Sequence, residues 1–230
     1  MTNVKQMNTK LLSEAARGCL LALVIGMTSS CASLLPASPP PPTTYTLQAL
    51  PNSQPALTQA LPANATQPTL IVHTPHAASG YQSRHMMYTR LAHQLEYYAQ
   101  SEWVAPPAQM LAPLILQAMQ ASVAFSAVVM APTHVVADYR LDTEMIRLQQ
   151  DFTRQPSTVQ LTVRVYLIHN ATRKVVAVRE FDEVATASSE DAYGGVIAAN
   201  QVVHHFLEKL TAFSQTHAVQ AQLSVTPPRN

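Results

Sequence analysis

Cysteine, glycine and charged residues are scarce in this chain of 230 residues, and each shortage argues against a class of protein. Two cysteines, Cys19 and Cys31, are too few for a disulfide scaffold or a cysteine-based zinc site. Five glycines supply no phosphate-binding loop, and the Gly-x-Ser-x-Gly motif of hydrolases is missing. Charged residues make up 12% of the chain, against roughly 25% in typical soluble domains. The formal net charge of +1 and the lack of a basic patch argue against nucleic-acid binding.

Nine histidines are present, but their spacing does not resemble a metal site. A helix points the neighbours His204 and His205 in different directions, and no cysteine or carboxylate cluster joins them. Asp142 and Glu144 share a strand face and could form a paired-carboxylate site, although a solvated strand face is the favoured interpretation. We therefore expect no catalytic residues, no metal and no cofactor, and we predict that the protein is not an enzyme.

The N-terminal 30 residues have the pattern of a secretory signal. An apolar run over 18–27 follows Lys5, Lys10 and Arg17 and is too short to span a bilayer unaided. Small residues then lead to Cys31, although Thr28 stands where a lipoprotein signal usually has leucine. We predict cleavage before Cys31 and lipidation of its thiol with diacylglycerol. The alternatives are an ordinary signal peptide cut nearby and an uncleaved anchor.

Composition divides the rest of the chain into three parts. Residues 31–43 contain Pro36 and Pro39 to Pro42 and are predicted to be a semi-rigid extended tether. A proline-rich ligand for another module is the alternative interpretation. Residues 44–217 are predicted to form a single domain, and 218–230 a disordered tail.

The clearest structural signal is a three-strand meander over about 138–186. In its middle strand, apolar residues from Val159 to Leu167 alternate with more polar ones, which predicts one buried face. The preceding strand changes phase after Met145, as a β-bulge would require. Short turns over 153–157 and 170–173 make the three strands antiparallel.

Weaker patterns complete a predicted α+β fold, with a mixed, mainly antiparallel sheet and two helices packed on it. The first helix begins at Pro107 and kinks at Pro113, or begins near Ala112. The second runs from an N-cap in 188–191 to about Thr216 and carries a broad apolar face. The other expected elements are a short piece at 45–47, a buried strand at 70–72, a pair of strands within 85–103 and a strand at 125–130.

Aromatic residues are concentrated between 81 and 103. Two interpretations are open: they fill the core beneath the helices, or they form an exposed patch for a protein partner or a lipid chain. On the second interpretation, the candidate contacts are Tyr81, Tyr88, Tyr97 and Trp103, with Tyr98 beside them.

Several of these residues occur in a pattern that resembles the ABC-type transport auxiliary lipoproteins, the PqiC-like family associated with MCE-domain lipid transport systems. The most specific part is a tryptophan followed by a double proline and a helix. The matching residues are Tyr45-x-Leu47, Leu70-Ile71-Val72, Tyr81, Met87-Tyr88, Leu95-x-Tyr97-Tyr98, Trp103-Val104-Ala105-Pro106-Pro107, Leu111, Tyr139-x-Leu141, Leu148-x-x-Asp151-Phe152, Phe181 and Ala198-Ala199-Asn200.

The resemblance implies a non-catalytic periplasmic domain, anchored by lipid at Cys31 to the outer membrane of a Gram-negative cell. Ala32 after the cysteine, in place of aspartate, agrees with sorting to that membrane. The implied partners are an MCE-domain protein and ABC transporter subunits, and the implied role is phospholipid trafficking. The charge-poor surface also makes a homo-oligomer plausible. The rival hypotheses are another envelope assembly lipoprotein, such as a pilotin or secretion-system component, and an envelope hydrolase.

Overall fold

The computed structural model describes residues 40–48, 67–122 and 124–225, with side chains described as far as 218. The predicted signal peptide, Cys31 and most of the tether lie outside the described residues. The chain divides into two units, 1–41 and 42–230, and the account below concerns the second. Within the described residues, neither helix has an apolar stretch long enough to cross a membrane.

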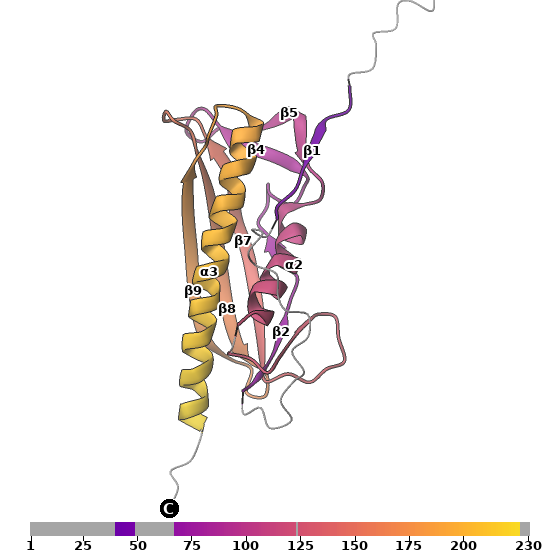
Figure 1. Cartoon of the computed structure of the whole chain (residues 1–230), viewed down its shortest axis with the longest axis vertical. Helices are drawn as coiled ribbons and strands as arrows, with labels where there is room; N and C mark the ends of the chain where they lie inside the picture. Colours follow the sequence, from indigo (N-terminus) through magenta and orange to yellow (C-terminus); the bar gives the residue numbers. More distant parts are fainter. Residues whose placement is uncertain (1–39, 49–66, 123, 226–230) are drawn as a thin grey trace, which may run out of the picture. The chain divides into compact units, whose positions relative to one another are not determined.

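Strand β7 (Tyr139–Asp151) is the centre of the sheet (Figure 1). It pairs antiparallel with β8 (Thr158–His169), which pairs antiparallel with β9 (Lys174–Thr186). Short turns join the three strands, so the predicted meander is confirmed.

The predicted phase change in β7 is a β-bulge. Met145 lies opposite Val163, but Arg147 lies opposite Thr162, so Ile146 is an extra residue in this strand. The insertion keeps both Met145 and Leu148 buried although they are three residues apart. One inserted residue therefore allows a long strand to hold its apolar side chains on a single face.

On its other edge, β7 pairs in parallel with three short strands in succession along its length. These are β2 (Thr69–Val72), β3 (His76–Ala77) and β4 (His85–Thr89). Three further strands extend the sheet: β6 (Ala127–Met130) beside β2, β5 (Glu96–Trp103) antiparallel to β4, and β1 (Thr43–Tyr45) parallel to β5. The pair of strands predicted within 85–103 is β4 and β5.

Helix α2 (Pro107–Gln120) begins at Pro107 and continues through Pro113. Proline at position 113 removes the hydrogen bond that the carbonyl of Gln109 would otherwise accept. Both residues are exposed, so water can satisfy that carbonyl. This location explains why the helix does not have to begin near Ala112.

Helix α3 (Ala192–Val225) begins where the sequence predicted. Asp191 is the N-cap: its Oδ1 accepts a hydrogen bond of 2.7 Å from the Gly194 N–H, which lowers the pKa of the Asp191 carboxyl. The predicted end near Thr216 is wrong, because residues 217–225 contain no glycine or proline and continue the helix. The tail predicted from 218 is thus helical as far as Val225, and 226–230 lie outside the described residues.

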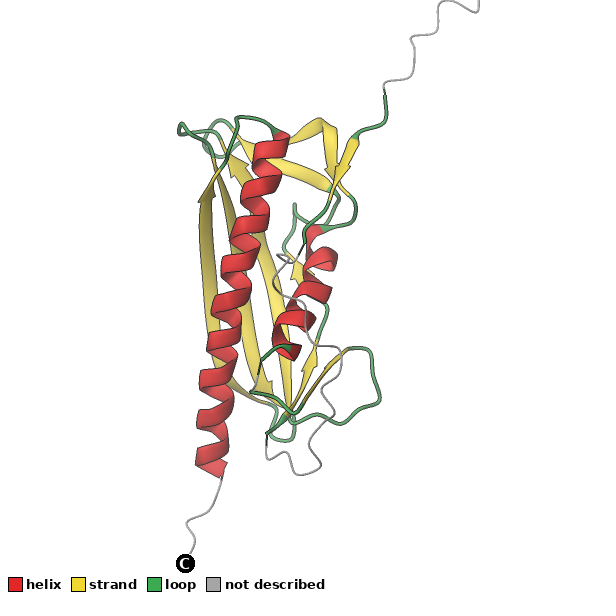
Figure 2. Ribbon diagram, viewed as in Figure 1, coloured by secondary structure: helices red, strands yellow, loops and turns green. Residues whose placement is uncertain are grey.

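Both helices cover the same face of the sheet (Figure 2). Helix α3 packs on β8 and β9, and α2 packs on β2, β6 and α3. Phe181 of β9 contacts Phe206 and Phe213 of α3 edge-on, with ring centroids 5.5 and 5.9 Å apart. The buried face of β8, from Val159 to Leu167, completes this core as predicted.

The opposite face of the sheet carries polar pairs between strands. Arg164 of β8 donates to Glu144 of β7 at 3.1 Å and to Glu180 of β9 at 2.8 Å. Side-chain pairs of this kind suit a sheet face that meets water.

Candidate functional site

The candidate aromatic residues divide between the core and the surface. Trp103 is only 3% exposed and belongs to the core, so it is not part of an exposed patch. Tyr97 is 54% exposed and stacks on His85 with ring centroids 4.3 Å apart. Tyr81 is half-buried and donates to Gln149 Oε1 at 2.5 Å, and burial raises the pKa of its hydroxyl. The core interpretation therefore holds for Trp103, and the four candidates do not form one exposed surface.

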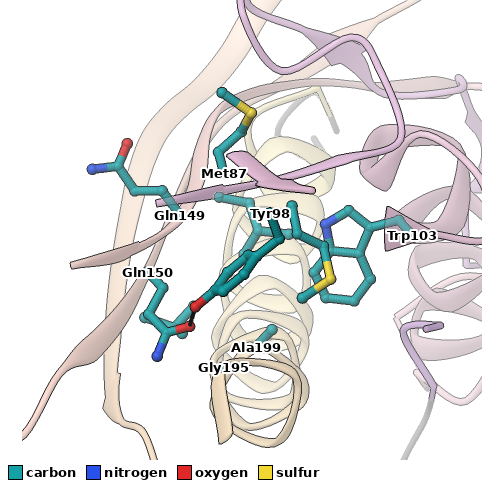
Figure 3. A pocket seen from close by; sticks show the side chains of 10 residues that line it. Met87, Tyr98, Trp103, Gln149, Gln150, Gly195 and Ala199 are labelled. Atoms are coloured by element: carbon teal, nitrogen blue, oxygen red, sulfur yellow. Dashed lines mark hydrogen bonds between the residues drawn. The ribbon is translucent and has the colours of Figure 1, made fainter. Parts of the chain in front are cut away.

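Trp103 lines a small cavity between the end of the sheet and α3 (Figure 3). Its volume is about 20 Å³, which is enough for about one water molecule. Ligand pockets usually measure roughly 300–1,000 Å³. This cavity is therefore too small to hold a lipid acyl chain.

A chain of hydrogen-bonded polar groups, with buried Gln150 and Ser157 at its centre, runs beside the cavity and joins β5, β7 and the segment before α3. Tyr98 donates to Gln150 Oε1 at 2.9 Å, and Gln150 Nε2 donates to Ser157 Oγ at 3.0 Å. The Ser157 N–H donates to Glu190 Oε1 at 2.9 Å. Burial is the main cause that raises the pKa of the Tyr98 hydroxyl, which keeps it protonated as the donor.

Gly195 allows α3 to approach this polar chain closely. A Cβ at position 195 would lie 2.2 Å from Gln150 Oε1, far inside van der Waals contact. A side chain at position 195 would therefore displace Gln150, which Tyr98 and Ser157 hold in place.

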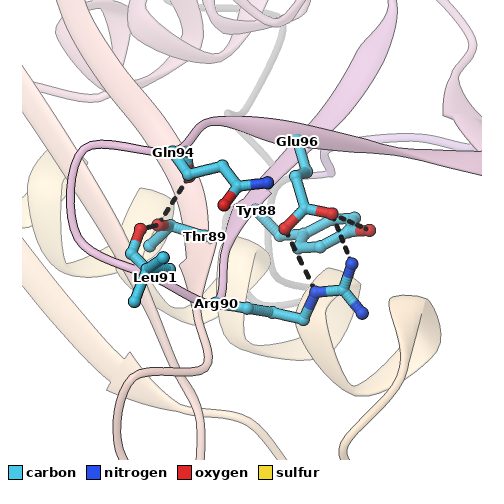
Figure 4. Close-up of polar contacts among 6 residues, drawn as sticks. All are labelled: Tyr88, Thr89, Arg90, Leu91, Gln94 and Glu96. Carbon is cyan, nitrogen blue, oxygen red and sulfur yellow. Dashed lines mark hydrogen bonds and ion pairs between the residues drawn. The ribbon is translucent and has the colours of Figure 1, made fainter.

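The β4–β5 hairpin is held by a cluster of polar contacts (Figure 4). Arg90 donates from two nitrogens to Glu96, and Tyr88 donates to the same carboxylate at 3.2 Å. The hydrogen bond from Arg90 is the largest cause that lowers the pKa of Glu96. The Thr89 hydroxyl lies 2.8 Å from the carbonyls of both Leu91 and Gln94 and closes the turn. The Tyr88 hydroxyl is thus held by a hydrogen bond within the hairpin.

The first described residues are built into the domain at two points. The Val104 N–H donates to the carbonyl of Tyr45, directly after the pairing of β1 with β5. Further along, Asn200 of α3 accepts from the Gln48 N–H at 2.8 Å and lies 3.4 Å from the carbonyl of Thr46. The chain entering from the tether is thus fixed to both the sheet and the long helix.

The other polar candidates form ion pairs with basic side chains. Asp142 pairs with His73 at 2.9 Å and with Arg140 at 3.2 Å, whereas Glu144 pairs with Arg164. In the described part of the chain, no three His, Cys, Asp or Glu side chains are grouped to hold a metal ion. Cys31 lies outside the described residues.

Sequence reasoning missed the roles of Gln150, Gly195 and Asn200. Each left a faint signal, because Gln150 and Asn200 are polar residues on otherwise apolar faces, and Gly195 is a helix-disfavouring residue in a first turn. Their partners lie far away in the sequence, so the pattern alone did not identify what they contact.

The fold and this site define a small α+β domain whose N-terminal segment is secured at one end of the sheet. Residues 45–211 match the family model for the ABC-type transport auxiliary lipoprotein component. The chain belongs to this family, which confirms the resemblance found in the sequence.

Solved structures share the fold. The crystal structure of protein XCC0632 from Xanthomonas campestris is 21% identical, with a TM-score of 0.63 over 80% of this chain and 97% of that chain. The crystal structure of an uncharacterized protein is 12% identical, with a TM-score of 0.58 over 76% of this chain and 99% of that one. A comparison with curated proteins found no match.

Proposed function

We propose that the protein is a non-catalytic, lipid-anchored auxiliary component of an MCE-type ABC transport system. In this proposal, diacylglycerol on Cys31 holds the domain at the periplasmic face of the outer membrane. The domain then supports phospholipid trafficking between the two membranes by docking on the MCE-domain protein and transporter subunits. Family membership supports the association with an ABC transporter.

The observation that carries the proposal is the attachment of residues 43–48. Strand β1 pairs with β5, and Asn200 binds the backbone on both sides of Leu47. Leu47 itself is buried in the core. A domain held by an N-terminal lipid needs such an attachment, because a force on the tether acts first on the segment where the tether joins the domain.

The cavity beside Trp103 is about 20 Å³ and excludes an acyl chain. On the described surface, Tyr97 and the β9 side chains Val175, Val178 and Val184 are each more than half exposed. We propose that such surfaces, rather than an internal lipid site, contact the partner proteins.

Intact mass and membrane fractionation from the native host test the anchor. We expect a mass gain consistent with triacylation and recovery in the outer membrane. Cys31→Ser should abolish both, whereas the matched control Cys19→Ser should keep both, because position 19 is removed with the signal. An unmodified wild-type protein would refute the anchor.

Affinity capture of the lipidated protein tests the assembly. Recovery of an MCE-domain protein with a permease and an ATPase would support the proposal. Recovery of secretion-system components in their place would favour the rival assembly role.

A further inference from the structure

Exposed apolar side chains gather where the N-terminal segment enters the domain. Tyr193, in the first turn of α3, is 58% exposed, and its ring centroid lies 6.3 Å from that of half-buried Tyr45. Val104 is 53% exposed and is hydrogen-bonded through its backbone to Tyr45. We name Tyr45, Val104 and Tyr193 the tip patch.

The β4–β5 hairpin has its turn beside the last residues of β7 and at the opposite end of β5 from Tyr45 and Val104, because Tyr88 pairs with Glu96 whereas Tyr45 pairs with Trp103. Leu91 and Leu95 in its turn are both exposed. Three charged groups nearby are already engaged within the domain: Arg90 pairs with Glu96, and Asp191 caps α3. The charges beside the tip patch are also paired with each other, because Arg84 contacts Glu102, the residue opposite Thr44. Binding at the tip patch would therefore depend little on charge.

The length of the tether limits how far the tip patch can lie from an anchor. Residues 32–42 separate Cys31 from β1, and a fully extended polyproline chain of this length spans about 35 Å. A lipid on Cys31 would therefore keep the tip patch close to the bilayer. At such a high effective concentration, even a weak apolar contact is populated.

We propose that the tip patch is a second, reversible membrane contact that inserts into the interfacial region of the bilayer. The proposal rests on the proposed lipid anchor at Cys31. Tyrosine suits this region because its ring enters the apolar layer while its hydroxyl stays in water. Val104 binds by apolar burial, as in interfacial proteins.

Contact at the tip patch orients the domain. The loop before β7, where Val136 is 94% exposed, lies beyond the start of that strand, whereas β4, which carries β5 and the tip patch, pairs with its last residues. The tip patch would thus face the outer membrane while the Val136 loop points into the periplasm, toward partners that come from the inner membrane.

Depth-dependent quenching tests the contact on the natively lipidated protein. A fluorophore is placed at Val104→Cys, with Val136→Cys as the matched reporter at the far end. The protein is reconstituted into phosphatidylcholine vesicles that contain nitroxide-labelled phosphatidylcholine. We expect several-fold stronger quenching at 104 than at 136, with little change between low and high salt. Tyr193→Ser should lower the bound-to-free ratio roughly fivefold, whereas Val178→Ser, a similarly exposed residue on β9, should not.

The outcomes separate this inference from the anchor itself. Equal quenching at 104 and 136 on protein whose intact mass shows the lipid would overturn the membrane contact and leave the anchor intact. The membrane contact would also be overturned if the fluorophore at 104 became shielded from solvent only after a partner protein was added. In that case the tip patch would be a protein interface. A protein without the lipid mass would overturn the anchor first.

Discussion

Substitution of Gly195 by alanine tests the close approach between α3 and the buried polar chain. In an exposed helix, this change should stabilise the protein by about 1 kcal/mol, because alanine has the higher helix propensity. Here the new Cβ would lie 2.2 Å from Gln150 Oε1, so the Gln150 side chain must move. Movement breaks its hydrogen bonds to Tyr98 and Ser157 and leaves buried polar groups unpaired.

Loss of those two bonds should cost about 3–4 kcal/mol in total, since each unpaired buried group costs roughly 1–3 kcal/mol. After the propensity gain, we expect Gly195→Ala to lower the free energy of unfolding by about 2–3 kcal/mol. In a domain of this size, the melting temperature should fall by roughly 5–10 °C.

Urea unfolding followed by Trp103, the single tryptophan, measures the effect. The control is the Gln150→Ala background, in which the obstructing side chain is gone. There Gly195→Ala should become neutral or stabilising, and the double-mutant cycle should show a coupling energy above about 2 kcal/mol. A Gly195→Ala protein as stable as the wild type in the native background would refute the reasoning.

Three further predictions follow from the site and the core. Asn200→Ala should release the entering segment, with faster hydrogen exchange at the Gln48 amide and a loss of about 1 kcal/mol; unchanged exchange would show that β1 alone holds this segment. Phe206→Ala should lower the free energy of unfolding by about 3–5 kcal/mol in urea, because the side chain is fully buried; a smaller loss would mean that the core can close over the gap. Because Arg90 lowers the pKa of Glu96, the stability that this pair contributes is present above the ordinary glutamate pKa and is lost as the pH falls through the lowered value. Arg90→Ala should therefore raise the Glu96 pKa in an NMR titration, and its urea midpoint should converge with that of the wild type in acid; parallel midpoints at all pH values would contradict this.

Local periodicity was sufficient for the meander and for much of α3. Val159 to Leu167 alternate with a period of two, and the bulge after Met145 follows from one change of phase. The predicted end of α3 near Thr216 was wrong, because the residues beyond it up to Val225 include no proline or glycine that would stop the helix.

The burial of the aromatic residues could not be predicted from the sequence pattern. Trp103 and Tyr97 lie on the same strand, yet one is buried and the other exposed. Which of them faces the helices depends on how β5 pairs with β4, and how β4 pairs with the far end of β7. The sequence predicted the pair of strands, but neither its register nor its pairing with β7.

The sequence by itself determined the α+β class, the meander with its bulge, the apolar face of α3 and the family. These features depend on neighbours in the chain, for which backbone geometry fixes the spacing of buried side chains. Only the tertiary structure decided that Gly195 lies against Gln150, that Asn200 holds the entering segment and that Tyr45, Val104 and Tyr193 lie together. Each depends on contacts between residues 45 to more than 150 positions apart, and those contacts exist only once the sheet has brought distant strands together.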